Sequence, residues 1–493
     1  MYANSSKKQS VKVIFSEALM VVAVIVTVII LALLVSGYWL NSNFEVERNG
    51  MLQISSLPTG ADVEIDGESS SWLERTNSSK ILSSGEHSVV LTKDGYDSWS
   101  KTINISEGLL YRLHYPRLFL NNRKVSEVLD IAKYTSATVP SHHNSILLMN
   151  DTTEWAYVNL DTDNPQPRAI SIAGLFIGTT SDSDENKNNA FTGKVLKADW
   201  DFDASHILFK VANGEAIEWV LLDVNNVEKS INLTKEFDAT FSRVEILDNN
   251  SNTLLAVRNQ NLHRIDIPGR LISAILVKNI EDFDHYHNEI VFSALKDDSV
   301  DENDSSAVET TLLESEDDNQ SDVALRYNIG YFKLGDSKPK ILTHTATPAK
   351  VTISKFYDNK YLSIIEGQTV SVHQKDDFDE QIAKYELSFL PDKVEVGHDG
   401  EFLLFTKEHQ LATLDMEAKR VMEWTIESDF GWIDNDMLYT VSDGELIVYD
   451  YDGFNRRVIA EGVSSRFPVV ITSDKWLYYA KNSKLMREWL IPR

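Results

Sequence analysis

The feature that most constrains the fold is a weak repeat of short apolar runs, which extends from about residue 120 to residue 493. Asp, Asn and Gly separate the runs, and no long stretch has the 3.6-residue period of a helix. Once insertions are removed, the repeat is about 40 residues, which is typical of four-stranded β-propeller blades. Because such short strands cannot bury their faces alone, we expect them to stack radially around a ring.

Eight repeat units can be counted, and seven is the alternative. Their approximate ranges are 145–172, 194–234, 241–278, 279–345, 349–388, 392–427, 428–460 and 464–490. The last unit is shorter than the others, so we expect an N-terminal strand from within residues 115–130 to complete it. The predicted fold class is mainly β, with the propeller over residues 120–493.

One repeat unit carries a recognisable turn. Residues 446–459 read LIVYDYDGFNRRVI, and Asp452, Gly453 and Asn455 predict a tight hairpin turn between two strands. This strand–turn–strand segment resembles the repeats of TolB-type propellers. The resemblance supports a propeller fold and gives no information about a ligand.

Two polar stretches interrupt the repeats. Residues 177–190 predict a surface loop. Residues 297–322 contain 11 acidic residues and neither Lys nor Arg. Such a block repels itself and lacks apolar residues, so it predicts a disordered insertion in one blade. An interaction segment is the alternative.

A separate apolar segment lies near the N-terminus. Residues 18–35 read ALMVVAVIVTVIILALLV, with Thr27 as the one polar member, and no charged residue occurs from residue 18 to residue 44. About 20 apolar residues in a helix cross the hydrocarbon core of a bilayer. We therefore predict a cytoplasmic tail over residues 1–17 and a single transmembrane helix over residues 18–40, in contact with lipid.

The flanking charges predict the orientation of this segment. Lys7, Lys8 and Lys12 precede it, so the positive-inside rule places the N-terminus in the cytoplasm and the later domains outside. A signal peptide cleaved near residues 35–37 and a buried core helix are the alternatives. The run is longer than the usual apolar region of a signal peptide and has no polar face, so we favour an uncleaved signal anchor in a bacterial cell membrane.

Residues 50–115 predict a small β-sandwich. Apolar residues alternate with polar ones in several short runs, and Asp-Gly turns separate these runs. Residues 56–67, SLPTGADVEIDG, resemble the opening of a PEGA domain, and later turn residues follow in that family's order. The residues that carry the resemblance are Pro58, Gly60, Ala61, Asp66, Gly67, Gly85, Gly95 and Tyr96. The segment around Arg75-Thr76-Asn77 departs from the family pattern. The resemblance implies a membrane-proximal surface domain of the bacterial envelope, with no catalytic residues.

Composition excludes several kinds of chemistry. The net charge is −28, of which residues 1–40 contribute +2 and the rest −30, so we expect no binding to nucleic acid. The chain has no cysteine, which excludes disulfides, iron–sulfur clusters and cysteine nucleophiles. It also lacks a nucleophile elbow, a P-loop and a dinucleotide-binding glycine motif.

The candidate metal ligands are Asp199, Asp201 and Asp203, which have the spacing of a calcium loop. The loop lacks the glycine and the final glutamate that EF-hand geometry requires. Aspartates that cap a turn are therefore the preferred interpretation, and we expect no metal, cofactor or catalytic residue.

The function predicted from these observations is non-enzymatic. A PEGA-like domain connects a membrane anchor to a propeller, and the propeller presents binding loops to another envelope protein or a cell-surface polymer. The alternatives are an extracytoplasmic glycan hydrolase or lyase, and a scaffold subunit of an envelope complex. A ring of acidic residues and histidines around one mouth of the channel would favour the enzyme.

Overall fold

The computed structural model describes residues 17, 19–32, 38–40, 46–69, 75–140, 145–177, 191–247, 250–296, 326–397 and 399–490. The chain divides into two compact units, one up to Asn122 and the other from Arg123 to Ile491. Residues 1–16 of the predicted tail over residues 1–17, the acidic insertion over residues 297–322 and most of the polar loop over residues 177–190 lie outside the described residues.

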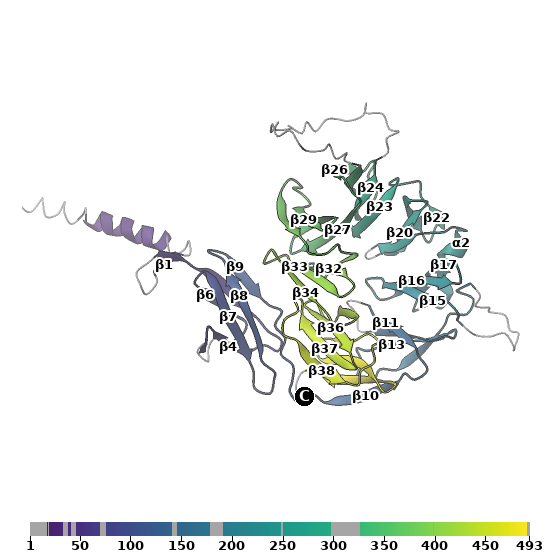
Figure 1. The fold of residues 1–493 in the computed structure, drawn as a ribbon, viewed down its shortest axis with the longest axis horizontal. Helices are drawn as coiled ribbons and strands as arrows, with labels where there is room; N and C mark the ends of the chain where they lie inside the picture. The colour runs from purple at the N-terminus through teal and green to yellow at the C-terminus, as the bar shows by residue number, and fades with distance from the viewer. Residues whose placement is uncertain are drawn as a thin grey trace, which may run out of the picture. The chain divides into compact units, whose positions relative to one another are not determined.

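The second unit is a ring of four-stranded antiparallel sheets (Figure 1). The first three blades consist of β11(Ser136–Thr138), β12(Ser145–Met149), β13(Glu154–Asn159) and β14(Pro167–Ser171); β15(Lys194–Trp200), β16(His206–Asn213), β17(Ala216–Asp223) and β18(Ile231–Asn232); and β19(Arg243–Leu247), β20(Asn250–Arg258), β21(Asn261–Asp266) and β22(Leu271–Ile272). A short 3₁₀ turn, η1(Val227–Lys229), and a one-turn helix, α2(Leu233–Glu236), flank β18.

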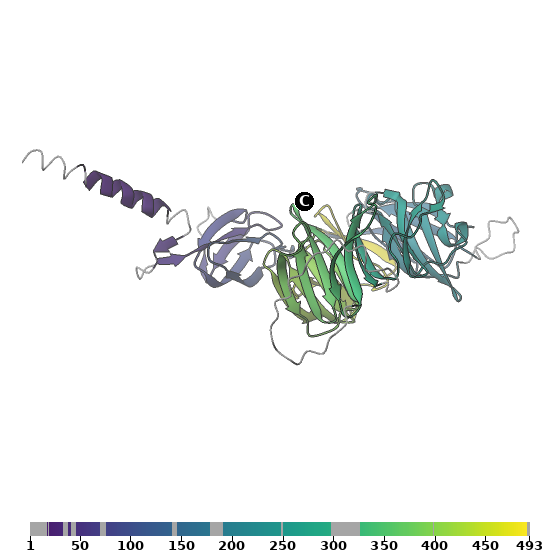
Figure 2. The same ribbon diagram turned by 90° about the horizontal axis from the view of Figure 1, so that it is seen from above.

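Four further blades follow in chain order, and Figure 2 shows the ring from its rim. They consist of β23(Ile280–Tyr286), β24(Glu289–Leu295), β25(Tyr327–Lys333) and β26(Lys340–Thr345); β27(Ala349–Phe356), β28(Asn359–Glu366), β29(Thr369–Gln374) and β30(Gln381–Glu386); β31(Lys393–Val396), β32(Phe402–Lys407), β33(Gln410–Asp415) and β34(Arg420–Thr425); and β35(Phe430–Trp432), β36(Met437–Ser442), β37(Glu445–Asp450) and β38(Arg457–Glu461).

The last blade joins both ends of the repeat region. Its strands are β39(Val470–Thr472), β40(Trp476–Lys481), β41(Lys484–Trp489) and β10(Val125–Asp130), and β10 runs antiparallel to β41, with Val125 opposite Glu488 and Asp130 opposite Lys484. A strand from before the first blade thus completes the last one. The described part of this unit therefore contains eight four-stranded sheets, and the predicted mainly β propeller is confirmed.

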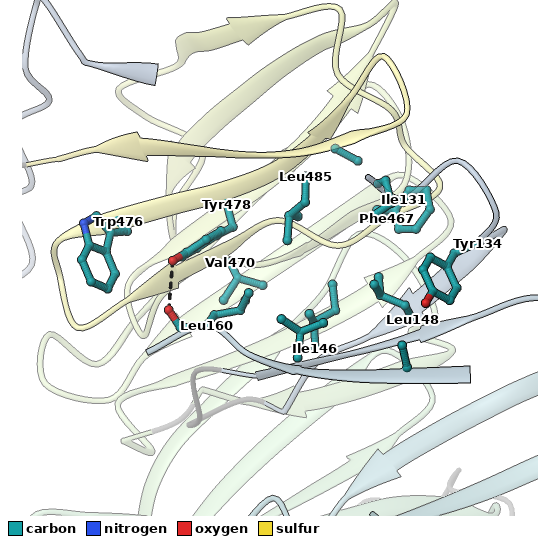
Figure 3. Close-up of a cluster of buried hydrophobic side chains, with 13 residues drawn as sticks. Ile131, Tyr134, Ile146, Leu148, Leu160, Phe467, Val470, Trp476, Tyr478 and Leu485 are labelled. Atoms are coloured by element: carbon teal, nitrogen blue, oxygen red, sulfur yellow. Dashed lines mark hydrogen bonds between the residues drawn. The ribbon is translucent and has the colours of Figure 1, made fainter. Parts of the chain in front are cut away.

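The propeller core lies between successive blades. The second strand of a blade, such as β12 or β32, is buried on both faces, which explains its continuous apolar sequence. Figure 3 shows one such cluster, where Tyr478 and Leu485 of the last blade pack against Ile146 and Leu148 of the first. The hydroxyl of buried Tyr478 donates a hydrogen bond to the carbonyl of Leu160 at 2.9 Å. Apolar packing and this bond hold the closing blade to the first blade.

The first unit contains a small β-sandwich. One sheet has the order β6(Ser78–Leu82), β3(Gly50–Ile54) and β9(Leu110–Leu113), and the other has β5(Glu68–Ser69), β4(Asp62–Ile65), β7(Gly85–Thr92) and β8(Trp99–Ile105). Side chains that alternate along these strands, among them Leu52, Val63, Val89 and Trp99, are buried. The apolar residues of the alternating pattern thus form the inner face of the sandwich.

The N-terminal segment differs in part from the prediction. Residues 19–32 form a helix whose described side chains are all exposed. Within the described residues, no helix has the length and apolar character needed to cross a membrane. The predicted helix over residues 18–40 is wrong at its C-terminal end, because Tyr38–Leu40 form β1, which pairs antiparallel with β2(Val46–Arg48). Residues 18 and 33–37 lie outside the described residues.

Candidate functional site

The propeller contains a cavity of about 630 Å³ next to the first strands of five consecutive blades. These strands are β15, β19, β23, β27 and β31, and each contributes at least one charged residue to the lining. The first strand of a blade faces the centre of a propeller, so the cavity is part of the central channel. We define this cavity and its lining as the channel site.

Arg243 on β19 is the centre of an ion-pair network in the channel site. Its guanidinium lies 2.6 Å from a carboxylate oxygen of Glu245 and 2.6 Å from one of Asp282 on β23. The same group donates a 2.7 Å hydrogen bond to the carbonyl of Phe283 and lies 4.2 Å from the centre of that ring. Arg243 therefore cross-links two neighbouring blades through a planar donor group.

Two aspartates of β23 extend this cross-link to the next blade. A carboxylate oxygen of Asp282 accepts a 2.9 Å hydrogen bond from the backbone N–H of Val351 on β27. Asp284 accepts a 3.0 Å bond from the N–H of Ile353 and another from the hydroxyl of Thr352. These carboxylates replace the backbone partners that β27 lacks at its inner edge, so their role in the channel wall is to join blades.

Burial perturbs the carboxylates of this network. Desolvation raises the pKa of Glu245, although Arg243 and His285 nearby act in the opposite direction. Desolvation also raises the pKa of Asp282, again against Arg243. For Arg243, burial acts to lower the pKa, but the two carboxylates outweigh it and the pKa is raised. The imidazole Nε2 of His285 lies 3.8 Å from a carboxylate oxygen of Glu245.

A pH dependence follows from the Glu245 carboxyl. Because its pKa is raised on folding, the folded state binds this proton more tightly than the unfolded state, and stability falls as pH rises from the ordinary value of 4.5 through the raised value. We expect Glu245→Gln to lack this loss of stability. The free energy of unfolding of the variant, relative to that of the wild type, should therefore increase as pH rises from 4.5 through the raised pKa of Glu245. Urea unfolding at a series of pH values measures this difference, and a difference independent of pH would contradict it.

Lysines provide most of the remaining charge in the channel site. Lys350 and Lys355 lie on β27, and Lys197 and Lys393 lie on β15 and β31. Lys197 pairs with Asp199 at 2.7 Å, and Lys350 donates to the carbonyl of Asp392. With Arg243, the lining has five basic residues against four acidic ones, whereas the whole chain has a net charge of −28. The channel site is therefore much less acidic than the rest of the protein.

The aspartates predicted as weak metal candidates do not converge. Asp199 on β15 pairs with Lys197, and Asp203 is exposed in the following turn. Asp201 is buried and accepts hydrogen bonds from the backbone N–H groups of Ser205 and His206, at 2.8 and 2.9 Å. Within the described part of the propeller taken alone, no three His, Asp or Glu side chains lie close enough to share a metal ion.

The other residues singled out in the sequence lie in turns and cores. Asp452, Gly453 and Asn455 lie between β37 and β38, where Gly453 has a φ of +81° and the Asn455 amide donates a 2.8 Å hydrogen bond to Asp450. Asp66 and Gly67 form the turn between β4 and β5, both with positive φ. The remaining predicted positions are Pro58, with a cis Leu57–Pro58 peptide, buried Ala61 and Tyr96, and the positive-φ residues Gly60, Gly85 and Gly95.

Sequence analysis missed the charged network of the channel site. The pattern that could have indicated it is a pair of charges two residues apart in the first strand of consecutive repeats, Arg243 with Glu245 and Asp282 with Asp284. Residues two apart on a strand share a face, so such a pair in the first strand of a blade points to the channel or its wall.

A family comparison covers the residues of the small β-sandwich in the first unit. Residues 49–116 match the PEGA domain. This PEGA domain covers a small part of the chain, and no curated protein matches the chain.

Several solved structures are similar to the chain at low identity. The computationally designed Ika8 protein has 8% identity and a TM-score of 0.41, covering 74% of this chain and 99% of its own. Apo AztD from Citrobacter koseri has 10% identity and a TM-score of 0.36, and the match covers 81% of this chain and 94% of the AztD chain. The Cps50 (Swd1) β-propeller domain of Myceliophteria thermophila has 9% identity and a TM-score of 0.36, and the match covers 75% of this chain and 100% of the Swd1 chain.

Proposed function

We propose that this protein is a membrane-anchored, extracytoplasmic binding protein of a bacterial cell envelope. Residues 18–35 hold it in the membrane, the PEGA domain follows on the outside, and the propeller binds an envelope protein or a cell-surface polymer without catalysing a reaction. The observation that carries the proposal is the channel site, a cavity of about 630 Å³ formed by the inner strands of five blades. Concave sites with a few fixed polar groups are the usual binding sites of folded proteins.

The charges of the channel site favour an anionic ligand. Arg243, Asp282 and Asp284 are engaged in joining blades, so they contribute little to a ligand. Lys350 and Lys355 of β27 are among the residues that line the cavity, and Lys355 is exposed. An acidic peptide or a phosphate-containing polymer would form charge-assisted hydrogen bonds with these ammonium groups.

Binding of defined polyanions by the full chain in nanodiscs tests this proposal. Polyglutamate represents an acidic protein segment, poly(glycerol phosphate) an anionic polymer, and dextran a neutral one. We expect one polyanion to bind, and we expect Lys350→Ala/Lys355→Ala to weaken its binding about tenfold, because each lost charge-assisted bond costs about 1.5–3 kcal/mol before solvent screening reduces it.

The matched control is Lys340→Ala/Lys384→Ala, which removes the same charge from exposed positions on the outer strands β26 and β30. This control should bind as the wild type does. Equal weakening in both double variants would show a general charge effect and would contradict binding in the channel site.

One observation favours a second candidate, an extracytoplasmic glycan hydrolase or lyase. Glu245 has a raised pKa and lies 3.8 Å from His285 in the channel site, which is a pattern found at acid–base sites. Shortening of a glycan probe that is lost in Glu245→Gln, with binding retained, would support the enzyme over the binding protein.

A further inference from the structure

An apolar row crosses the outer face of the three-stranded sheet of the PEGA domain. Met51 on β3 lies opposite Ile81 on β6 and opposite Leu110 on β9. The exposed fractions are 42% for Met51, 61% for Ile81 and 38% for Leu110, and the adjoining Leu109 is 63% exposed. We call these four residues the apolar row.

The apolar row is confined to one end of the sheet. Two residues further along the strands, the same face carries Gln53, Ser79 and Arg112, which are aligned with one another. The outer face therefore changes from apolar to polar along the strands. Three adjacent exposed apolar side chains cost free energy in water. Solubility alone therefore does not explain why the apolar side chains gather at one end of this face.

The topology places this end of the sheet close to the predicted anchor. Tyr38 follows the apolar segment and lies directly opposite Arg48 in the β1–β2 pair. Opposed Cα atoms in such a pair are about 5 Å apart, and Met51 is three residues beyond Arg48, a span of at most about 10 Å. Arg48, just before the sandwich begins, thus lies beside Tyr38. Met51 lies within about 15 Å of Tyr38.

We infer that the apolar row docks on the outer surface of the lipid bilayer. The inference rests on the proposed membrane anchor, since the helix of residues 19–32 has only exposed side chains and would place Tyr38 near the interface. Exposed apolar side chains enter the boundary between headgroups and acyl chains to a depth of about 5–10 Å. The PEGA domain is thereby held against the membrane by a second contact besides the anchor.

Single-cysteine probes in the full chain test the inference, because the natural sequence has no cysteine. A fluorophore is attached in three variants, Ile81→Cys in the apolar row, Ser88→Cys on the other sheet, and Val26→Cys in the helix. Ser88 is exposed and lies on a strand like Ile81, so it is the matched control. Each variant is placed as one copy per nanodisc, and quenching by spin-labelled lipids is measured.

We expect lipids labelled near the headgroup to quench the Ile81 probe and not the Ser88 probe. Replacing Met51, Leu109 and Leu110 by Thr in the Ile81→Cys variant should lower the docked-to-undocked ratio about tenfold or more. Equal quenching of the Ile81 and Ser88 probes would overturn the inference, provided that lipids labelled in the acyl chain quench the Val26 probe. If the Ile81 probe is shielded from water only in vesicles that hold many copies of the chain, the apolar row binds a second copy of the chain. That result would also overturn the inference.

Failure of the anchor gives a different result. In that case acyl-chain labels would not quench the Val26 probe, and both the proposed anchoring and the docking of the apolar row would be wrong. The Val26 probe therefore tests the membrane anchor, and the Ile81 probe tests the docking of the apolar row.

Discussion

Replacing Arg123 by methionine is expected to lower the free energy of unfolding of the propeller by about 3–5 kcal/mol, the usual cost of leaving one partner of a buried ion pair uncompensated. Arg123 lies just before the closing strand β10 and pairs with Glu488 on β41 at 2.5 Å, where the two side chains are 13% and 4% exposed. It also donates a 2.8 Å hydrogen bond to the carbonyl of Ile459 on β38. One side chain therefore joins the closing strand, the last blade and the blade before it.

The measurement for Arg123 is urea unfolding followed by tryptophan fluorescence. The double variant Arg123→Met/Glu488→Met should recover most of the loss, because a buried pair replaced by apolar groups of similar size is often nearly neutral. Lys484→Met is the matched control, since half-exposed Lys484 pairs with exposed Asp130 across the same two strands. A loss in Lys484→Met as large as in Arg123→Met would contradict this explanation.

Replacing Arg243 by methionine is expected to cost about 2–3 kcal/mol, which is below the cost at a fully buried pair because its side chain is 35% exposed. The substitution leaves the carboxylates of Glu245 and Asp282 without their main partner and disconnects β19 from β23. It should therefore also weaken binding in the channel site, whose walls these strands form.

The loss in Arg243→Met should depend on pH. Without the guanidinium, the pKa values of Glu245 and Asp282 rise further above their ordinary values, so protonation restores the folded state at low pH. The deficit is therefore smallest below the ordinary carboxyl range and increases as pH rises. Unfolding at a series of pH values measures this, and Arg456→Met, which breaks an exposed pair with Glu427, should show little loss at any pH.

Much of the fold could be predicted because each blade satisfies local rules. Central strands such as β32 are buried on both faces, so their sequence is a continuous apolar run, and turns such as Asp452-Gly453 need residues that accept positive φ. The shortened last repeat indicated that an earlier strand closes the ring, and β10 takes that place. These features depend on neighbouring residues, which sequence analysis can assess.

The channel site could not be predicted because it depends on contacts between blades. Arg243 meets Asp282 from the next repeat, and Asp284 meets Ile353 about 70 residues later. The spacing of two residues within each pair of charges indicates a shared face of a strand, but the local sequence does not show which residues of other blades these charges contact. The error at Tyr38–Leu40 has a similar origin, because the pairing of β1 with β2 overrides a helical expectation based on the apolar residues before it.

Hydrogen exchange of the full chain in nanodiscs, with and without the polyanion that binds, tests the central claim most directly. If the ligand occupies the channel site, it should slow exchange in residues 243–247, 280–286 and 349–356, with little change in the outer strands β26 and β30. Slower exchange only in the outer strands or in the PEGA domain would contradict the claim that the propeller binds its ligand in the central channel.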